Sequence, residues 1–199
     1  GVPVLVERSS YESDPLGRME WLKLYGVLLG KETQAQDLFQ KEVDALSGVL
    51  GQQSTGKTVA FFYITSSGSV NVHKSGDYIA EMIEMAGGKY VFSDLASDGS
   101  ALSTVNMQME AFYKGAKDAD VLIYNSAIDG ELQTIDQLLQ KSPLLADFKA
   151  VKSGDVWCTG KNLFQEPMGL GKLIVDIHTV LTEPDPDQSK LSYLHRLTK

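Results

Sequence analysis

The stretch Val59-Ala60-Phe61-Phe62-Tyr63-Ile64 decides the fold that this sequence predicts. It is a continuous apolar run of strand length without alternation of polar and apolar positions, which is typical of a strand covered on both faces. Strands of this kind occur in sheets that carry helices on both sides. The run therefore predicts a layered α/β fold built on a mostly parallel sheet.

Short apolar strands alternate with amphipathic helices along the rest of the chain. We expect further strands at residues 70–72, 90–92, 121–124 and 156–158, and helices at residues 78–85, 107–117, 135–140 and 168–181. This alternation is typical of a three-layer sandwich in which helices connect the strands of a mostly parallel sheet. Two prolines end the last helix, so Ser189 to Lys199 are expected to form a short helix or a frayed terminus.

The sequence before this region predicts one strand and two helices. The β-branched run from Val2 to Val6 has the composition of a buried strand. Asp14 as N-cap and Pro15 in the first turn begin a helix that Gly30 ends. A second amphipathic helix is expected from Glu32 to Leu50, which at about 19 residues would be roughly 28 Å long. Such a helix is long enough to brace two parts of a protein.

Charge and apolar content exclude several classes of protein. The 199 residues include 18 Lys and Arg against 26 Asp and Glu, a formal net charge of -8. An acidic chain is repelled by phosphate backbones, so nucleic acid is not an expected partner. The most apolar window, Trp21 to Leu29, falls short of the roughly 20 residues that a membrane-spanning helix needs. The single Cys158 cannot form an internal disulfide.

One motif, Gly51-Gln-Gln-Ser-Thr-Gly56-Lys57-Thr58, matches the letters of a phosphate-binding loop. That motif works when a strand precedes the loop and a helix follows it, because the backbone amides then converge on the phosphates. Here a helix precedes the loop and a strand follows it. We therefore favour a glycine-bounded turn, and a nucleotide- or phosphate-binding enzyme that uses the Gly51–Thr58 loop is the alternative.

The side chains that could act in catalysis or metal binding do not form a recognisable set. His73, His178 and His195 are far apart in the sequence and lack the spacing of a metal site. Asp118 and Asp120 flank the start of a predicted strand, where capping and turn formation account for aspartate. We expect no enzymatic activity, no catalytic residue and no metal ligand.

Two segments, Ala86–Phe92 (AGGKYVF) and Ala150–Trp157 (AVKSGDVW), carry a family resemblance, together with shorter segments at 1–6, 28–32, 109–112 and 119–123. In their order and spacing they resemble the second half of the ABC-transporter substrate-binding proteins for iron complexes and cobalamin, the class III periplasmic binding proteins. The resemblance implies one lobe of a two-lobe protein that clasps a metal chelate and delivers it to a membrane permease and its ATPase. The implied ligand is an iron siderophore, haem or a cobalamin-type chelate, with no intrinsic cofactor.

A complete member of that family has a signal or lipoprotein segment and a first lobe before the strand that begins this chain. By the resemblance, residues 1–58 comprise the last strand of the missing first lobe and the connecting helices, with Glu32–Leu50 as the inter-lobe helix. Residues 59–199 would form the C-terminal α/β lobe. The protein would be extracytoplasmic, in the periplasm or as a lipoprotein on the outer face of the cell membrane, held there by the missing N-terminal anchor. A stand-alone flavodoxin-like interaction module is the other alternative.

Ligands of open parallel sheets bind outside the carboxyl ends of the strands. That rule nominates the loops after the first and the last strand of the lobe, and the resemblance places ligand contacts on the same two loops. The side chains nominated there are Tyr63, Thr65, Lys161, Asn162, Phe164 and Gln165.

Three further residues are nominated outside these loops. Arg8 and Tyr11 would come from the lobe-one side of the cleft, where Arg8 could pair with a carboxylate, catecholate or phosphate of the ligand. A plain surface salt bridge is the alternative for Arg8. Glu110 matches the acidic residue with which the family meets a basic permease residue, and a solvated glutamate at a helix start is its alternative.

Overall fold

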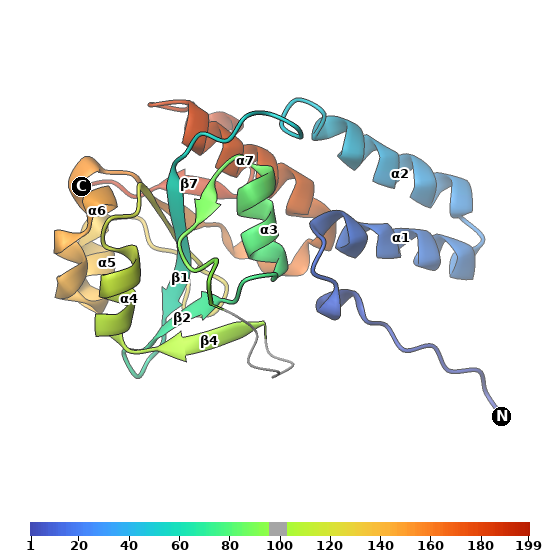
Figure 1. The fold of residues 1–199 in the computed structure, drawn as a ribbon. Coiled ribbons are helices and arrows are strands. Elements are labelled where there is room, and N and C mark those ends of the chain that lie inside the picture. The colour runs from blue at the N-terminus through green and yellow to red at the C-terminus, as the bar shows by residue number, and fades with distance from the viewer. Residues whose placement is uncertain (96–102) are drawn as a thin grey trace.

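The computed structural model describes residues 1–95 and 103–199 of the chain. Its centre is a seven-stranded sheet with the order β4-β2-β1-β5-β6-β7, and β3 also pairs with β1 (Figure 1). The strands are β1 (Thr58–Ile64), β2 (Val70–His73), β3 (Lys89–Tyr90), β4 (Thr104–Met107), β5 (Val121–Tyr124), β6 (Val156–Thr159) and β7 (Leu194–Arg196). β1 is parallel to β3 and β5, and β5 is parallel to β6. The antiparallel pairs β1–β2, β2–β4 and β6–β7 lie toward the two edges.

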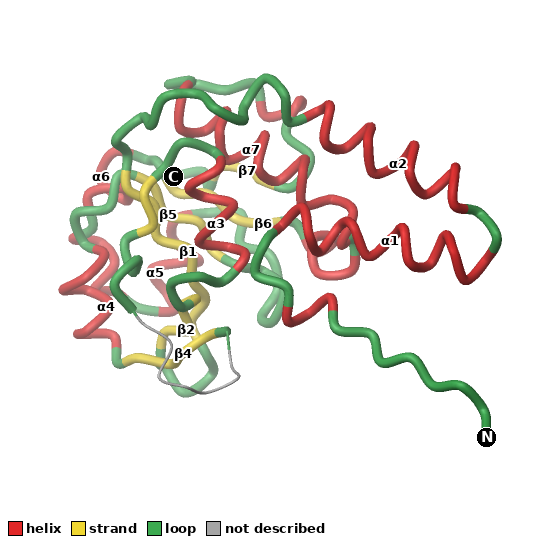
Figure 2. The backbone as a smooth tube through the Cα atoms, turned by 45° about the vertical axis from the view of Figure 1, so that its right-hand side comes forward, coloured by secondary structure: helices red, strands yellow, loops and turns green. Residues whose placement is uncertain are grey.

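Helices cover both faces of this sheet. One face carries α3 (Tyr78–Met85) and α7 (Leu170–Thr182), and the other carries α4 (Met109–Ala116), α5 (Ile135–Lys141) and α6 (Lys149–Ser153) (Figures 1 and 2). This arrangement confirms the predicted α/β sandwich. None of the helices in the described part of the chain is long and apolar enough to cross a membrane.

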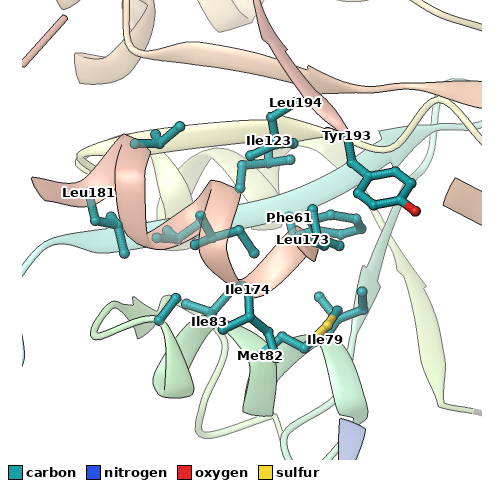
Figure 3. Packing of buried hydrophobic residues seen from close by; sticks show 14 of the residues in the cluster. Phe61, Ile79, Met82, Ile83, Ile123, Leu173, Ile174, Leu181, Tyr193 and Leu194 are labelled. Atoms are coloured by element: carbon teal, nitrogen blue, oxygen red, sulfur yellow. The ribbon is translucent and has the colours of Figure 1, made fainter. Parts of the chain in front are cut away.

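The alternation of side chains along β1 explains why both faces are covered. Val59 and Phe61 belong to the apolar cluster under α3 and α7, whereas Ala60 and Phe62 belong to the cluster under α4 to α6. Successive residues of a strand point to opposite faces, so an uninterrupted apolar strand needs a helix layer on each side. Figure 3 shows Phe61 between side chains of α3 and α7.

Two helices before β1 form a hairpin that projects from this sandwich (Figures 1 and 2). They are α1 (Pro15–Leu29) and α2 (Glu32–Ala45). The Asp14 side chain accepts hydrogen bonds from two backbone amides of the first turn of α1, and Gly30 ends the helix in the left-handed conformation with φ of 64°. Both ends of the first helix are therefore as the sequence predicts.

The second helix is shorter than predicted, because α2 ends at Ala45 and not at Leu50. Two hydrogen-bonded turns follow, and they bring Leu46 and Val49 into the core. Gly48 lies in these turns, and glycine costs about 1 kcal/mol in a helix interior. Burial of the two apolar side chains outweighs continuation of the helix here.

The segment from Val2 to Val6, which the sequence predicts as a strand, does not form one in this structure. The segment has no regular secondary structure, and Val2 and Val4 are 87% and 85% exposed. A strand needs the hydrogen-bonding groups of a neighbouring strand, and within the described residues none lies beside this segment. Figure 1 shows it leading away from the body of the molecule.

Several predicted boundaries near the edges of the sheet also change. β4 was not predicted, and the helix expected from Met107 begins as α4 at Met109. β3 ends at Tyr90, because the chain turns over residues 91–94. The C-terminal region forms a 3₁₀ turn and then β7 in place of a helix or frayed end. The reason is Asp176 of α7, whose carboxylate accepts hydrogen bonds from three backbone amides at residues 192–194 and directs them toward β6.

Candidate ligand-binding site

A cavity of about 280 Å³ lies between the N-terminal segment and the α/β sandwich. Its walls come from the 3₁₀ turn at Ser9–Tyr11, from α1, α3 and α7, from β1 and from the segments that follow β5 and β6. The lining residues are Ser9, Ser10, Arg18, Phe61, Tyr78, Ile79, Met82, Asn125, Ala127, Leu163, Leu170 and Leu173.

The topology of the sheet explains why the cavity lies at the carboxyl ends of β5 and β6. β5 and β6 are parallel neighbours, so their carboxyl ends meet at one edge of the sheet. Asn125 directly follows β5, and Leu163 lies in the segment after β6. The cavity therefore opens at the sheet edge where ligands of parallel α/β folds bind.

Arg18 of α1 is held in one orientation at the cavity wall. Its Nε donates a hydrogen bond of 2.6 Å to the carbonyl oxygen of Glu12, and its Nη2 donates one of 2.8 Å to that of Ser10. Its Cζ lies 3.7 Å from the centroid of the Tyr78 ring, a cation–π contact between α1 and α3. Arg18 thus joins the N-terminal segment to the sandwich.

Tyr78 begins α3 beside a buried polar pair. Asp77 Oδ1 accepts hydrogen bonds from the Ile79 amide at 3.0 Å and lies 2.6 Å from Nδ1 of His73. Burial raises the pKa of Tyr78, the Asp77 charge raises it further, and Arg18 opposes both. Tyr78 is therefore a neutral phenol at physiological pH, able to donate or accept a hydrogen bond.

Asn125 contributes an amide to the opposite wall. Its side-chain oxygen accepts a hydrogen bond of 3.0 Å from the Ala127 backbone amide, and its own backbone amide donates to Phe62 at 2.8 Å. These bonds fix the residue where β5 ends. The side-chain nitrogen has no hydrogen bond within the part of the chain that the structure describes, so it is available to donate.

The charge on the cavity wall is positive. Among the described lining residues Arg18 is the only charged one, although the chain as a whole carries a formal charge of -8. In residues 1–95 and 103–199, no group of three or more His, Cys, Asp or Glu side chains could hold a metal ion. The arrangement can bind a solute through hydrogen bonds, one guanidinium group and apolar contacts.

Arg8 and Tyr11 lie beside the cavity, which neither of them lines. Both are exposed, and Arg8 Cζ lies 5.2 Å from the centroid of the Tyr11 ring. Their neighbours Ser9 and Ser10 are the residues of this segment that line the cavity.

Tyr63 and Thr65 are not brought to the cavity. β1 continues directly into a tight turn toward antiparallel β2, and the Thr65 amide donates a hydrogen bond of 2.8 Å to Ser69 across that turn. Tyr63 packs against the apolar cluster on the other face of the sheet. A strand at residues 70–72 was expected, but its antiparallel pairing with β1 was not, and this pairing closes the carboxyl end of β1.

The loop after β6 is a short 3₁₀ helix, Lys161–Gln165, at the edge of the cavity. Lys161 and Asn162 are exposed, and the Lys161 amide donates a hydrogen bond of 2.6 Å to Glu131. Leu163 is the residue of this helix that lines the cavity. The side chains of Phe164 and Gln165 lie outside the described part of the structure.

Glu110 is exposed in the first turn of α4, on the helix layer opposite α3 and α7. It is thus separated from the cavity by the sheet.

The sequence reasoning missed Arg18, Tyr78 and Asn125. Asn125 follows a predicted strand directly, so applying the carboxyl-end rule to every strand would have found it. Arg18 and Tyr78 lie on helices, and their approach to each other depends on the packing of α1 against α3, for which the sequence gives no local signal.

The Gly51–Thr58 loop follows α2 and its turns and leads into β1, which is the order of elements that predicted a turn and not a phosphate-binding loop. Its amides are used within the fold: the Gly56 and Lys57 amides donate to the side chains of Ser54 and Thr55, and the Thr58 amide donates to Asp120 at 2.7 Å. These three amides are therefore not free to bind phosphate oxygens. This geometry argues against the nucleotide-binding alternative.

A parallel α/β lobe with a polar and apolar cavity at the carboxyl ends of its strands has the architecture of a small-molecule binding site. An uncharacterized lipoprotein of Methanocaldococcus jannaschii is 32% identical over 187 residues, which are 91% of this chain and 42% of that protein. The chain belongs to the periplasmic binding protein family, whose sequence profile matches residues 3–163. This family consists of solute-binding proteins and not enzymes. Membership of this family therefore favours a solute-binding role over the alternative of a flavodoxin-like interaction module.

Solved structures share the fold at low sequence identity. The ABC-type Fe3+-hydroxamate transport system from Saccharomonospora viridis has a TM-score of 0.68 at 17% identity, over 86% of this chain and 57% of that one. The periplasmic heme binding protein HutB of Vibrio cholerae has a TM-score of 0.65 at 19% identity, over 87% and 66% of the two chains. The chain spans less than half of the length of the curated relatives that it matches.

Proposed function

We propose that this chain supplies the C-terminal lobe of the substrate-binding component of an ABC importer for metal chelates. Residues 1–58 would contribute the last strand of a first lobe and the connecting helices, and residues 59–199 the second lobe. The cavity at the carboxyl ends of β5 and β6 carries this proposal, because it faces the N-terminal segment that would come from the first lobe. Membership of the periplasmic binding protein family supports it.

Exposed apolar side chains in the N-terminal region support the proposal that a first lobe packs against this chain. Val2 and Val4 are 87% and 85% exposed, and Val27 and Leu29 at the end of α1 are 59% and 71% exposed. Full burial of such a side chain contributes roughly 1.5–3 kcal/mol. A first lobe that packs here would be stabilised by covering them, and it would give residues 2–6 the strand partner that they lack.

The proposed ligand is an iron or cobalt chelate. Solved relatives that share the fold include proteins described as binding heme and ferrichrome, which favours an iron siderophore or haem over cobalamin. The cavity lies just below the roughly 300–1,000 Å³ of complete ligand sites, so one lobe would hold one side of the ligand. Contacts to the rest of the ligand are proposed for Arg8, Tyr11, Lys161, Asn162, Phe164 and Gln165.

Delivery to a permease would place the protein outside the cytoplasm. A lipoprotein among the curated relatives supports this location, either in the periplasm or on the outer face of the cell membrane. Glu110 is proposed to meet a basic residue of the permease, since it is exposed at the start of α4 on the face away from the cavity.

A side chain that fills the cavity should abolish ligand binding. Ala127 lines the cavity, whereas the next residue, Ile128, is 64% exposed and does not. We expect saturable binding of ferrichrome or haem by the wild type and by Ile128→Phe, but not by Ala127→Phe. Because one lobe forfeits the contacts of the other, the dissociation constant should be in the millimolar range.

Quenching of tryptophan fluorescence measures this binding, with circular dichroism to show that each variant is folded. Equal binding by the two phenylalanine variants would place the ligand outside the cavity. A wild-type chain that binds neither chelate at millimolar concentration would contradict the proposed function.

A further inference from the structure

We infer that the cavity selects chelates with an anionic oxygen edge, a carboxylate or catecholate, and that Arg18 and Asn125 are the residues that select it. The inference rests on the proposed function and concerns the chemical class of the ligand. It follows from which hydrogen-bonding groups of the cavity wall are already used in the fold and which are not.

The guanidinium group of Arg18 is held in a fixed position and has N–H donors that the fold does not use. A guanidinium group carries five N–H donors, and the bonds to Glu12 and Ser10 use the Nε and Nη2 atoms. Within the described residues Nη1 has no hydrogen bond. The contact with the Tyr78 ring holds the plane of the group, so a ligand need not pay to order a flexible side chain.

Asn125 is a second donor on the other side of the cavity. Because its side-chain oxygen already accepts the Ala127 amide, its side-chain nitrogen is the atom left for a ligand. Arg18 comes from α1 and Asn125 from the end of β5, so a ligand group that meets both must supply acceptors. No acidic side chain lines the cavity among the described residues, so these two donors match carboxylate or catecholate oxygens.

The remaining surface is apolar. Ile79, Met82, Leu163, Leu170 and Leu173 line it, and none of the described lining residues is acidic. Such a surface suits the hydrocarbon or aromatic body of a chelate. A neutral hydroxamate chelate also offers acceptors, but an anionic oxygen gains in addition the Coulomb attraction of the guanidinium charge and can form a bidentate pair with it. The wall therefore favours an anionic over a neutral chelate.

Matched ligands test this inference on the full chain. Haem and a ferric triscatecholate provide anionic oxygens, whereas haem dimethyl ester and ferrichrome are their neutral counterparts. Calorimetry and fluorescence would compare the wild type with Arg18→Gln and Asn125→Asp. Lys31→Gln is the control, because it removes one positive charge from an exposed side chain at the connection between α1 and α2 that does not line the cavity.

We expect the wild type to bind at least one anionic chelate more tightly than its neutral counterpart. Arg18→Gln and Asn125→Asp should each weaken that anionic chelate by about tenfold or more, and change the neutral one by less than about threefold. Lys31→Gln should leave both affinities within about twofold of the wild type. Thermal melting of each variant establishes that it is folded.

Three outcomes overturn the inference while the proposed function stands. They are a wild type that prefers neutral chelates, equal losses for both ligand classes in Arg18→Gln, and a loss in Lys31→Gln as large as that in Arg18→Gln. Should Arg18→Gln fail to fold, Asn125→Asp decides the question alone, and equal losses for both classes in that variant overturn the inference. Binding of none of the four chelates overturns the proposed function and the inference together.

Discussion

At the scale of single residues, Asp120 organises the start of two strands. Its Oδ2 accepts hydrogen bonds from the Thr58 amide at 2.7 Å and the Thr58 hydroxyl at 2.8 Å, and its Oδ1 accepts one from Lys149 at 2.5 Å. The sequence predicted a local capping or turn role for this aspartate, whereas its side chain bonds to Thr58 and Lys149, which are distant in the sequence. The same contacts remove the Thr58 amide from the apparent phosphate-binding loop.

The stability of the fold should depend on pH through Asp120. Burial raises the pKa of its carboxyl group, but hydrogen bonds from Lys149 and Thr58 more than offset this and hold the pKa below its ordinary value. A carboxyl group with a lowered pKa in the folded state stabilises the fold above its unfolded pKa, and this contribution is lost as the pH falls through the folded value. Asp120→Asn should be less stable than the wild type at neutral pH and lose less stability between about pH 5 and pH 2.

Urea unfolding at a series of pH values measures both effects. Asp118→Asn is the control, since this neighbouring carboxylate is exposed, and it should keep the wild-type pH profile. Identical profiles for Asp120→Asn and the wild type would show that Asp120 makes no such contribution.

At the scale of elements, the α1–α2 hairpin depends on a close approach between two small residues. A Cβ atom added at Gly26 would lie 2.5 Å from the Cβ of Ala35, and Gly26 is buried. Alanine has the higher helix propensity by about 1 kcal/mol, but overpacking costs typically 1–3 kcal/mol. Gly26→Ala should therefore lower the melting temperature despite its better propensity.

The exchange of the two residues provides the control for this prediction. Ala35→Gly added to Gly26→Ala removes the clash, so the double variant should recover part of the lost stability. A melting temperature of Gly26→Ala at or above that of the wild type would contradict the close-packing account.

Elements with a signal in their own residues were predictable from the sequence. Asp14 and Gly30 mark the ends of α1, and the apolar run of β1 requires cover on two faces. β4 and β7 were missed because their pairing depends on other elements. Three of the four residues of β4 are half-buried and one is exposed, and β7 is directed by the carboxylate of Asp176 on α7.

The candidate site was predictable in position but not in its residues. The rule of the carboxyl ends pointed to the segment after β6, and Leu163 of that segment lines the cavity. The same rule failed at Thr65, because an antiparallel partner turns the chain back at the end of β1. Arg18 comes from a helix, and only tertiary packing places it at the cavity.

At the scale of the whole molecule, the cavity lies where the N-terminal segment meets the α/β sandwich. Arg18 and the 3₁₀ turn at Ser9–Tyr11 form one wall, and the ends of β5 and β6 form the other. A ligand there would contact both parts of the chain at once. In the proposed two-lobe protein, closure of the first lobe over this edge would complete the site.

Paramagnetic broadening in nuclear magnetic resonance spectra tests the central claim, that the cavity binds an iron chelate, most directly. High-spin ferric iron in ferrichrome broadens the amide signals near it, and the gallium complex of the same chelator is the diamagnetic control. If the chelate binds in the cavity, we expect the amide signals of Ser10, Asn125 and Leu163 to broaden and the signals of α4 and α5 to remain unchanged. Broadening centred on α4 and α5, or no difference between the two metals at millimolar chelate, would contradict it.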